Sequence, residues 1–329
     1  MTSLIEPRLA HAVRRAAVRA TMAPSVHNTQ PWRFVLSGHS LEIHADWSRR
    51  LRILDPSGRQ LLVSCGCAVL NARVSLAAAG YAATVDLFPD PVQPNLLARL
   101  TLPNHRVDHV PLGELDAVVE LRRTNRRRFA DEPVPDDIVD ALVSAASEEG
   151  AELVSIDRPE HRLAAVRLSH RADELENADP AYRAELRAWT SDDPRRLDGV
   201  PAIAVPHVDA GAHDVLPIRD FDTRGMGWSP TETRSGTDQC LLLLGTLADT
   251  PAAWLRAGEA LERVLLEITR RGYAASPLTQ VIEVAATNAQ LRQELQLRMH
   301  PHVLLRVGRA PTTPATRRRR LASMIEEAH

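Results

Sequence analysis

A short loop near the N-terminus carries a dense group of polar side chains that could do chemistry. It lies between an alanine-rich segment and Trp32, and Pro24 and Pro31 restrict its backbone. Many free donors and acceptors on a fixed backbone suit a flat heteroaromatic ring, because a few hydrogen bonds to its edge set its orientation. From the residues alone, a ligand site and a well-ordered structural loop are equally good interpretations. The polar residues are Ser25, His27, Asn28, Thr29 and Gln30.

A cluster of arginines further along the chain is the second group that could do chemistry. The chain contains no lysine, so all 40 residues counted as Lys or Arg are arginines. A lysine Schiff base and a Walker A phosphate loop are therefore excluded, because each needs a lysine amine. An anion site in this chain must use arginine, whose planar guanidinium can donate two parallel hydrogen bonds to a phosphate. The cluster consists of Arg122, Arg123, Arg126, Arg127 and Arg128.

The composition is that of an ordinary globular protein. Of 329 residues, 44% are hydrophobic and 25% charged, and the formal net charge of -2 gives no reason to expect a nucleic-acid partner. The N-terminus lacks the apolar region of a secretory signal, and polar residues interrupt the most apolar stretch, residues 61–79. We therefore expect a cytoplasmic protein without a membrane span. Three cysteines are too few for a disulfide framework, and His300 and His302 lack partners at ligand spacing, so no metal site is expected.

The elements that position the loop follow from hydrophobic periodicity and turn residues. We expect a helix before the loop, a hairpin around Gly38 after it, a long helix that ends at Gly80, two more strands and an irregular link. These segments are residues 6–22, 33–36, 41–45, 59–79, 83–88, 97–102 and 104–115.

The segment after the arginine cluster is expected to begin with a helix capped by Asp136. Helices are expected over residues 136–147, 162–176, 181–189, 237–247, 251–271 and 278–297, with a last short helix after the basic tail 317–320. Strands are expected over residues 151–156, 203–208 and 302–307.

A faint internal repeat divides the chain. An alanine-rich helix, a loop and a strand occur both before Gly38 and over residues 136–157. We therefore expect a first half over residues 1–115 and a second half over residues 116–329. The second half includes residues 209–236, which contain Met226 and Trp228 without regular period. Long irregular segments of this kind are usually functional lids or poorly ordered.

The loop sequence APSVHNTQPWRF resembles the nitroreductase superfamily, in which the pattern APS-x-x-N-x-QPW-x-F recurs. The arm RRTNRRRFADEPVP also resembles that family, which has an arginine, a small polar residue and a second basic residue shortly before a Phe and a Pro-Val pair. Aligned on Phe129, the resemblance implies that Arg123, Asn125 and Arg127 contact the phosphate and ribityl chain of a flavin. Asn125 stands where serine is usual.

In most of that family the loop follows the arm, and a homodimer builds two flavin sites at its interface. Here the loop precedes the arm, which resembles the tandem, actinobacterial Acg-like branch. The resemblance implies an α+β nitroreductase-like fold of two tandem half-domains that form an intrachain pseudo-dimer. Each half keeps a different part of one site, so one flavin mononucleotide (FMN) per chain and a monomer or weak homodimer are implied.

The resemblance implies an NAD(P)H-dependent oxidoreductase that reduces a nitroaromatic or quinone-type small molecule through flavin N5. No catalytic side chain is named, because the flavin carries the chemistry. Two alternatives stay open: a non-catalytic protein that stores or sequesters FMN beneath a lid over residues 209–236, and a degenerate form without flavin. The implied cofactor-binding residues are Pro24, Ser25, His27, Asn28, Gln30, Arg123, Asn125, Arg127, Ser276, Pro277, Arg318 and Arg320.

Overall fold

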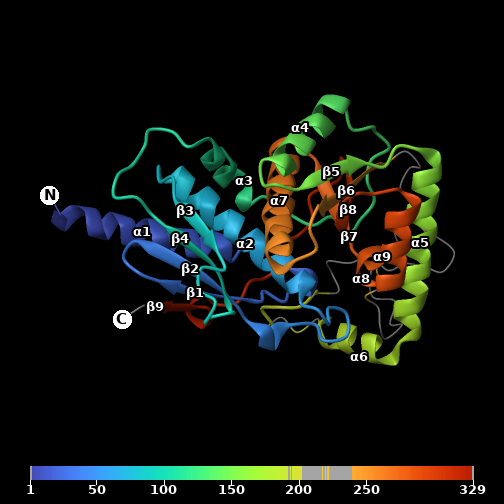
Figure 1. Cartoon of the computed structure of the whole chain (residues 1–329), viewed down its shortest axis with the longest axis horizontal. Helices are drawn as coiled ribbons and strands as arrows, with labels where there is room; N and C mark the ends of the chain where they lie inside the picture. Colours follow the sequence, from blue (N-terminus) through green and yellow to red (C-terminus); the bar gives the residue numbers. More distant parts are fainter. Residues whose placement is uncertain are drawn as a thin grey trace.

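Two units, each a sheet with helices, lie side by side in the protein (Figure 1). One long helix from each unit, α2 (Arg59–Ala78) and α7 (Pro251–Arg270), pack on each other between the two sheets. The computed structural model describes residues 2–191, 193, 195–201, 217, 219, 221 and 239–327, with side chains from residue 7 onward.

The first unit combines α2 with a five-stranded sheet. Helix α1, Thr2–Ala20, packs on α2 through alanines and a leucine that recur at helical spacing. The strand order is β3-β4-β2-β1-β9, and β9 runs parallel to β1 whereas the other neighbours are antiparallel. The strands are β1 Trp32–Leu36, β2 Ser40–Ala45, β3 Thr84–Leu87, β4 Leu96–Thr101 and β9 Ile325–Glu327.

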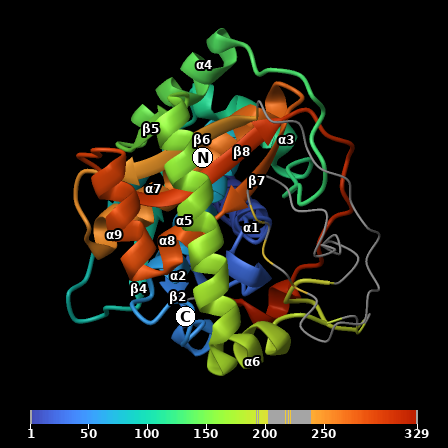
Figure 2. The same cartoon turned by 90° about the vertical axis from the view of Figure 1, so that its right-hand side faces the viewer.

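The second unit combines α7 with a four-stranded antiparallel sheet in the order β5-β6-β8-β7. Helices α4 and α7 cover one face of this sheet, and α5, α8 and α9 cover the other (Figure 2). The elements are α4 Asp136–Ser147, β5 Glu152–Ser155, α5 Pro159–Ala178, α6 Pro180–Ala188, β6 Cys240–Thr246, β7 Ala274–Leu278, α8 Gln280–Glu283, α9 Ala285–Glu294 and β8 His300–Gly308. Shorter segments are η1 Val26–Asn28, η2 Trp47–Arg49, η3 Pro111–Leu115, α3 Asp116–Val119 and η5 Leu321–Ser323.

The two units repeat one arrangement. Shifting each strand number by four converts the order β3-β4-β2-β1 into β7-β8-β6-β5. The crossing of α2 and α7 is reciprocal as well, because a Cβ at Gly66 would lie 2.0 Å from the carbonyl oxygen of Leu255 and a Cβ at Gly258 would lie 2.0 Å from that of Val63. Each carbonyl comes three residues before the opposite glycine. Contacts that are the same in both directions are typical of a twofold interface.

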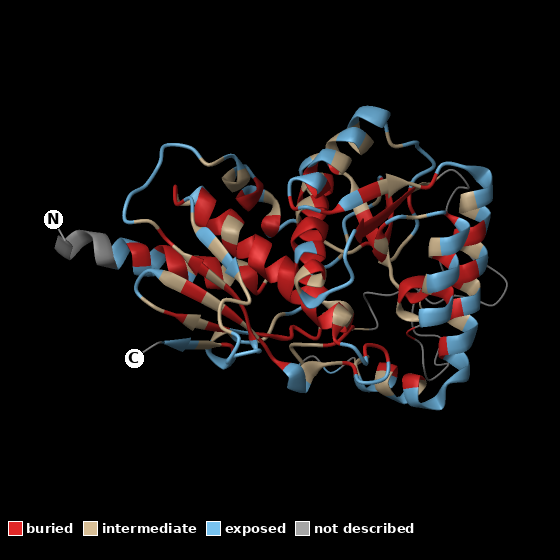
Figure 3. Ribbon diagram, viewed as in Figure 1, coloured by how far each residue is buried: buried red, intermediate tan, exposed pale blue. Residues whose placement is uncertain are grey.

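Helix α2 forms the centre of the core (Figure 3). By length and composition alone it could cross a membrane, but 89% of its apolar window is buried inside the protein. Cys65 and Cys67 on this helix are fully buried, and burial raises the pKa of both thiols. The two cysteines therefore pack as small, neutral side chains in the core.

The prediction of a helix over residues 237–247 was wrong, because residues 240–246 form strand β6. β6 lies between β5 and β8, so its backbone groups are paired on both edges. Its leucines are buried on both faces: Leu242 and Leu244 face α7, while Leu241 and Leu243 face α5 and α9. A strand buried on both faces shows no alternation of polar and apolar residues, so a short leucine run does not reveal its type.

Three further expectations need correction. The helix expected over residues 278–297 is divided, because β7 extends to Leu278 and α8 and α9 are separated at Val284, whose ψ of 113° is extended. Asp136 does not cap α4: the N-cap is Pro135, and no side-chain bond caps this end. The last short helix is instead η5 followed by β9. The strand expected over residues 203–208 lies outside the described residues.

Candidate functional site

The loop after α1 has an unusual backbone. His27, Asn28 and Gln30 have φ angles of 46°, 54° and 51°, in the left-handed region that few non-glycine residues adopt. The Ser25 hydroxyl accepts a hydrogen bond from the Gln30 N–H at 2.9 Å, and the Val26 N–H donates to the Ser64 hydroxyl of α2 at 3.2 Å. Such strained positions persist where the surrounding structure fixes them, and they cluster at functional sites. The loop therefore presents its polar groups on a rigid backbone.

Two adjoining cavities open beside this loop, one of about 120 Å³ and one of about 360 Å³. They share four lining residues, two from the loop and two from the arginine arm. The loop and the arm, which are far apart in the sequence, therefore meet at one composite site. The shared residues are Pro24, Ser25, Thr124 and Arg126.

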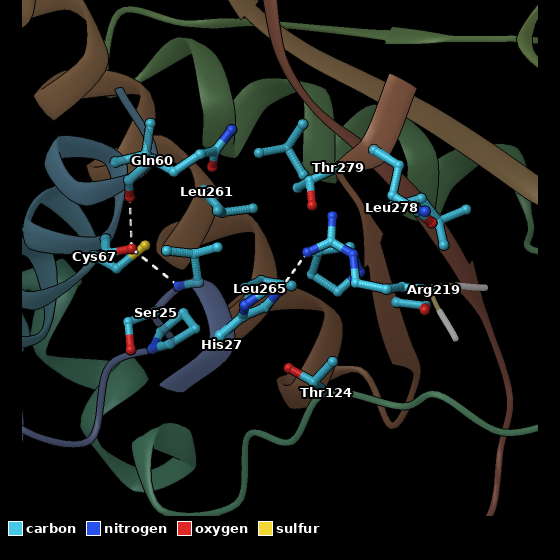
Figure 4. Close-up of a pocket in the computed structure, with 18 of the residues that line it drawn as sticks. Ser25, His27, Gln60, Cys67, Thr124, Arg219, Leu261, Leu265, Leu278 and Thr279 are labelled. Carbon is cyan, nitrogen blue, oxygen red and sulfur yellow. Dashed lines mark hydrogen bonds between the residues drawn. The ribbon is translucent and has the colours of Figure 1, made fainter. Parts of the chain in front are cut away.

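The smaller cavity has apolar walls and a polar rim. Leu261 and Leu265 of α7 form apolar parts of the wall (Figure 4). Val63 of α2 lines the cavity too, so both central helices contribute. Ser276 and Pro277 reach it from β7. A cavity with this lining suits a largely apolar planar group with a few polar atoms at its edge.

The larger cavity is strongly cationic. Four arginines line it, whereas its single lining carboxylate, Glu120, is already paired with Arg19. Among the described residues, no carboxylate pairs with Arg123, Arg126 or Arg318. Their uncompensated charge fits an anionic group such as phosphate, because guanidinium forks bind phosphate oxygens in pairs. The four arginines are Arg122, Arg123, Arg126 and Arg318.

The pKa values reflect this excess of positive charge. Burial and the nearby charge of Arg122 together lower the pKa of Arg318 to about 9. Burial likewise lowers the pKa of Arg126 to about 10, helped by the charges of Arg219 and Arg122. An anion in the cavity would stabilise the charged form of each arginine.

Eight of the twelve residues expected to bind a cofactor line these cavities. Pro24 and Ser25 line both, and the others divide between them. His27, Ser276 and Pro277 line the smaller cavity, and Asn28, Arg123 and Arg318 line the larger one.

The other four residues line neither cavity. Gln30 is fully buried and fastens the basic tail, since its amide oxygen accepts from the Arg319 N–H at 2.8 Å. Asn125 shapes the arm, because its side-chain oxygen accepts from the Arg127 N–H at 3.1 Å and its own N–H donates to the Ala275 carbonyl at 2.9 Å. Arg127 and Arg320 lie outside both linings.

Sequence reasoning missed several lining residues. Arg122 and Arg126 belong to the recognised arginine cluster, but alignment on Phe129 selected Arg123 and Arg127 instead. Arg219 and Phe221 line the smaller cavity although no regular spacing marked them. They belong to residues 209–236, of which the structure describes residues 217, 219 and 221; Met226 and Trp228 lie outside the described residues.

Arg219 and Phe221 meet the loop at His27. Arg219 donates to the His27 imidazole (Figure 4). Arg219 also forms an ion pair with Glu283, and Phe221 packs edge-on against the imidazole with ring centres 5.5 Å apart. Burial holds the pKa of His27 well below its usual value, and the charges of Arg219 and Arg126 lower it further. His27 is therefore a neutral imidazole at neutral pH.

Curated proteins of Mycobacterium tuberculosis are similar to almost the whole chain. Rv3131 of strain H37Rv, which its name assigns provisionally to the NAD(P)H nitroreductases, is 36% identical over 326 residues, or 96% of this chain and 92% of Rv3131. The protein acg, with the same provisional assignment, is 34% identical, and the match covers 93% of each chain. This chain belongs to the Acg-like branch of the nitroreductase family. The resemblance inferred from its loop and arm is confirmed.

Solved nitroreductases also resemble this family member at low identity. The FMN-dependent nitroreductase NfnB of Mycobacterium smegmatis, solved in complex with NADPH, is 16% identical, covers 66% of this chain and 100% of NfnB, and has a TM-score of 0.40. A nitroreductase of Desulfitobacterium hafniense with bound FMN is 13% identical, with 61% and 91% of the two chains covered and a TM-score of 0.40. No protein-family model matches the chain. The α+β nitroreductase-like fold class is confirmed by the family membership.

Proposed function

We propose that the protein is an FMN-dependent NAD(P)H oxidoreductase of the nitroreductase type. The observation that carries the proposal is the composite site, in which a cationic cavity and an apolar cavity share four lining residues. FMN has this division of character, with an anionic phosphate at one end and a planar ring at the other. The provisional NAD(P)H nitroreductase names of Rv3131 and acg support the choice of reductant.

The chain's own residues would bind and orient this cofactor. Arg122, Arg123 and Arg318 would hold the phosphate, and Ser276 and Pro277 would lie along the ring edge. The apolar walls would exclude water from the ring. The flavin supplies the hydride and electron transfer when bound, so no side chain is required as nucleophile or general acid.

We further propose an intrachain pseudo-dimer that binds one FMN. When Gly66 is aligned with Gly258, the cavity-lining residues Cys67 and Leu265 correspond to Glu259 and Arg73. Glu259 and Arg73 therefore mark the place in the opposite half where a second apolar cavity would lie. Arg73 there binds Glu259 at 2.8 Å, and the same arginine pairs with Glu149. Charged side chains that satisfy one another fill the place of the apolar cavity. This supports a single cofactor per chain. Because one chain supplies both halves of the pseudo-dimer, we expect a monomer or a weak homodimer.

The proposal is tested by the colour of the purified protein and by its bleaching. We expect a yellow protein, or apoprotein that becomes yellow with FMN, at one flavin per chain. Anaerobic NADPH or NADH should then bleach the flavin absorbance, and a nitroaromatic or quinone should restore it. Protein that stays colourless after mixing with FMN would overturn the proposal.

A second function is favoured by the contacts of Arg219 and Phe221 with His27. Side chains that cover the ring cavity would keep substrate away from a bound flavin, so the protein would store FMN without turnover. In the experiment above, a yellow protein that neither NADPH nor NADH bleaches would favour storage over reduction.

Phe221→Ala tests whether this cover limits access. Removing the ring should raise the anaerobic bleaching rate by about tenfold if opening of the cover is the slow step, as measured by stopped-flow absorbance. Phe88→Ala removes the same side chain at the turn after β3, away from both cavities, and should leave the rate unchanged. Equal rates in wild type and Phe221→Ala would mean that Phe221 does not restrict access.

A further inference from the structure

Glu262 is a fully buried carboxylate in α7 that lies next to the cationic cavity's lining residue Arg122. Its Oε1 is 3.4 Å from Nε of Arg122, which is only 5% exposed and lines the larger cavity. A buried carboxylate is therefore tied to the anion site through one arginine. Neither the loop pattern nor the arm pattern includes Glu262.

The polar atoms around Glu262 are poorly satisfied. Within the described part of the chain, neither carboxylate oxygen of Glu262 has a hydrogen-bond partner. The same is true of both amide atoms of Asn71 and of Nε and Nη1 of Arg122. Unsatisfied buried polar atoms cost free energy, so each needs an explanation such as a ligand, a water or a change of protonation. Of these three residues, Arg122 is the one that lines a cavity.

The charged and titratable groups that face Glu262 come from every neighbouring element. Asn71 and Cys67 face it from α2, Arg122 from the arm and Arg318 from the basic tail. Burial raises the pKa of the Cys67 thiol well above its usual value, so this group stays neutral. The two arginines are thus the charges that stabilise an ionised Glu262, and both also line the anion cavity.

Building on the proposed FMN site, we propose that Glu262 is a proton-binding positioning residue. As a carboxylate it holds Arg122 when the cavity contains no anion, and it takes up one proton from solvent when a phosphate group binds to Arg122 and Arg318. The net charge of the buried cluster then changes less than it would without proton uptake, because the dianionic phosphate replaces the carboxylate as the counter-ion.

The sign of the pH dependence follows from the same charges. Burial raises the pKa of Glu262 and outweighs the lowering effect of the Arg122 and Arg318 charges, so that the pKa is about 7. A bound phosphate engages the arginines and adds negative charge nearby, so it raises this pKa further. Binding that raises a pKa takes up protons, and affinity must therefore fall as the pH rises above 7.

Two other titrations limit the pH range in which the effect of Glu262 can be measured. The second ionisation of a phosphate monoester, near pH 6, would strengthen binding as the pH rises through that value. Arg318, with its pKa lowered to about 9, would lose its charge in more alkaline solution. Neither of these two groups titrates between pH 7 and 8.5. Burial also raises the pKa of Glu176 and of Glu259 to about 7, but neither residue lines either cavity, so the Glu262→Gln variant distinguishes Glu262 from them.

The experiment measures FMN binding to the full chain by calorimetry in two buffers that differ in ionisation enthalpy. At pH 8 we expect uptake of most of one proton per FMN, and a Kd that rises about tenfold between pH 7 and 8.5. Riboflavin has the same ring but no phosphate, so its binding should take up no proton. In Glu262→Gln, FMN should bind without proton uptake and with a Kd that is flat over this range.

The outcomes separate this inference from the proposed function. FMN binding without proton uptake, or uptake that persists in Glu262→Gln, would overturn the role of Glu262 and leave the flavin site standing. Failure of both FMN and riboflavin to bind would overturn the proposed function and this inference with it. If Glu262→Gln does not fold, the comparison of FMN with riboflavin in wild type decides, because equal proton uptake by the two ligands would contradict a phosphate-driven step.

Discussion

Gly66→Ala is expected to destabilise the protein by about 3 kcal/mol or more, which is at or beyond the usual cost of overpacking a core. The added Cβ would lie 2.0 Å from the Leu255 carbonyl oxygen and 2.9 Å from Cα of Gly258. Both neighbours are backbone atoms of a buried helix, so they cannot move aside without separating α2 from α7. Urea unfolding should show a much lower midpoint, or the variant should be insoluble.

Gly258→Ala should have a similar effect, because its Cβ would meet the Val63 carbonyl oxygen at the same distance. Gly38→Ala is the matched control: no atom lies within 4 Å of its added Cβ, so stability should hardly change. Wild-type stability in Gly66→Ala would show that the two helices do not cross at these glycines.

Arg123→Ala is expected to weaken FMN binding by about 1.5 to 3 kcal/mol, the scale of a hydrogen bond to a charged group. This corresponds to a Kd about 10- to 150-fold higher. In the structure Arg123 donates to the backbone carbonyls of Glu120 and Arg122, at 2.6 and 2.7 Å, and has no carboxylate partner among the described residues. Its loss should therefore remove a phosphate contact without breaking an ion pair in the core.

Fluorescence titration with FMN measures this loss, and riboflavin separates the phosphate contact from damage to the ring site. Riboflavin affinity should be nearly unchanged in Arg123→Ala. Arg128→Ala removes the same charge from an exposed position on the same arm, outside both cavities, and should have little effect on FMN. An unchanged FMN affinity in Arg123→Ala would show that the arm does not hold the phosphate.

Much of this molecule could be predicted from its sequence where local patterns are strong. The long helices were recognisable because their apolar residues recur at helical spacing and because Gly80 marks the end of α2. β6 was not, because strands covered on both faces have no alternation and its leucines fit a helix equally well.

The site was predictable in its parts but not in its details. The loop and the arm could be found by their residue patterns. The direction in which each arginine side chain of the arm points, however, depends on the turn that Asn125 forms with Arg127. Arg219 and Glu262 could not be found, because their role arises from contacts between distant segments. No local spacing records a contact of that kind.

The late position of the basic tail and the residues just before it in the chain predicts the order in which the parts of the site come together. Thr313 to Thr316 and Arg318 line the larger cavity, the Arg318 guanidinium donates to the backbone carbonyls of Thr21 and Met22, and β9 then pairs with β1. These residues follow every other lining residue in the chain, so they are synthesised after the rest of the cavity lining. A nascent chain that still lacks them has an open cavity with one arginine missing. Cofactor loading is therefore expected to come late in synthesis, after the tail has closed over the first unit.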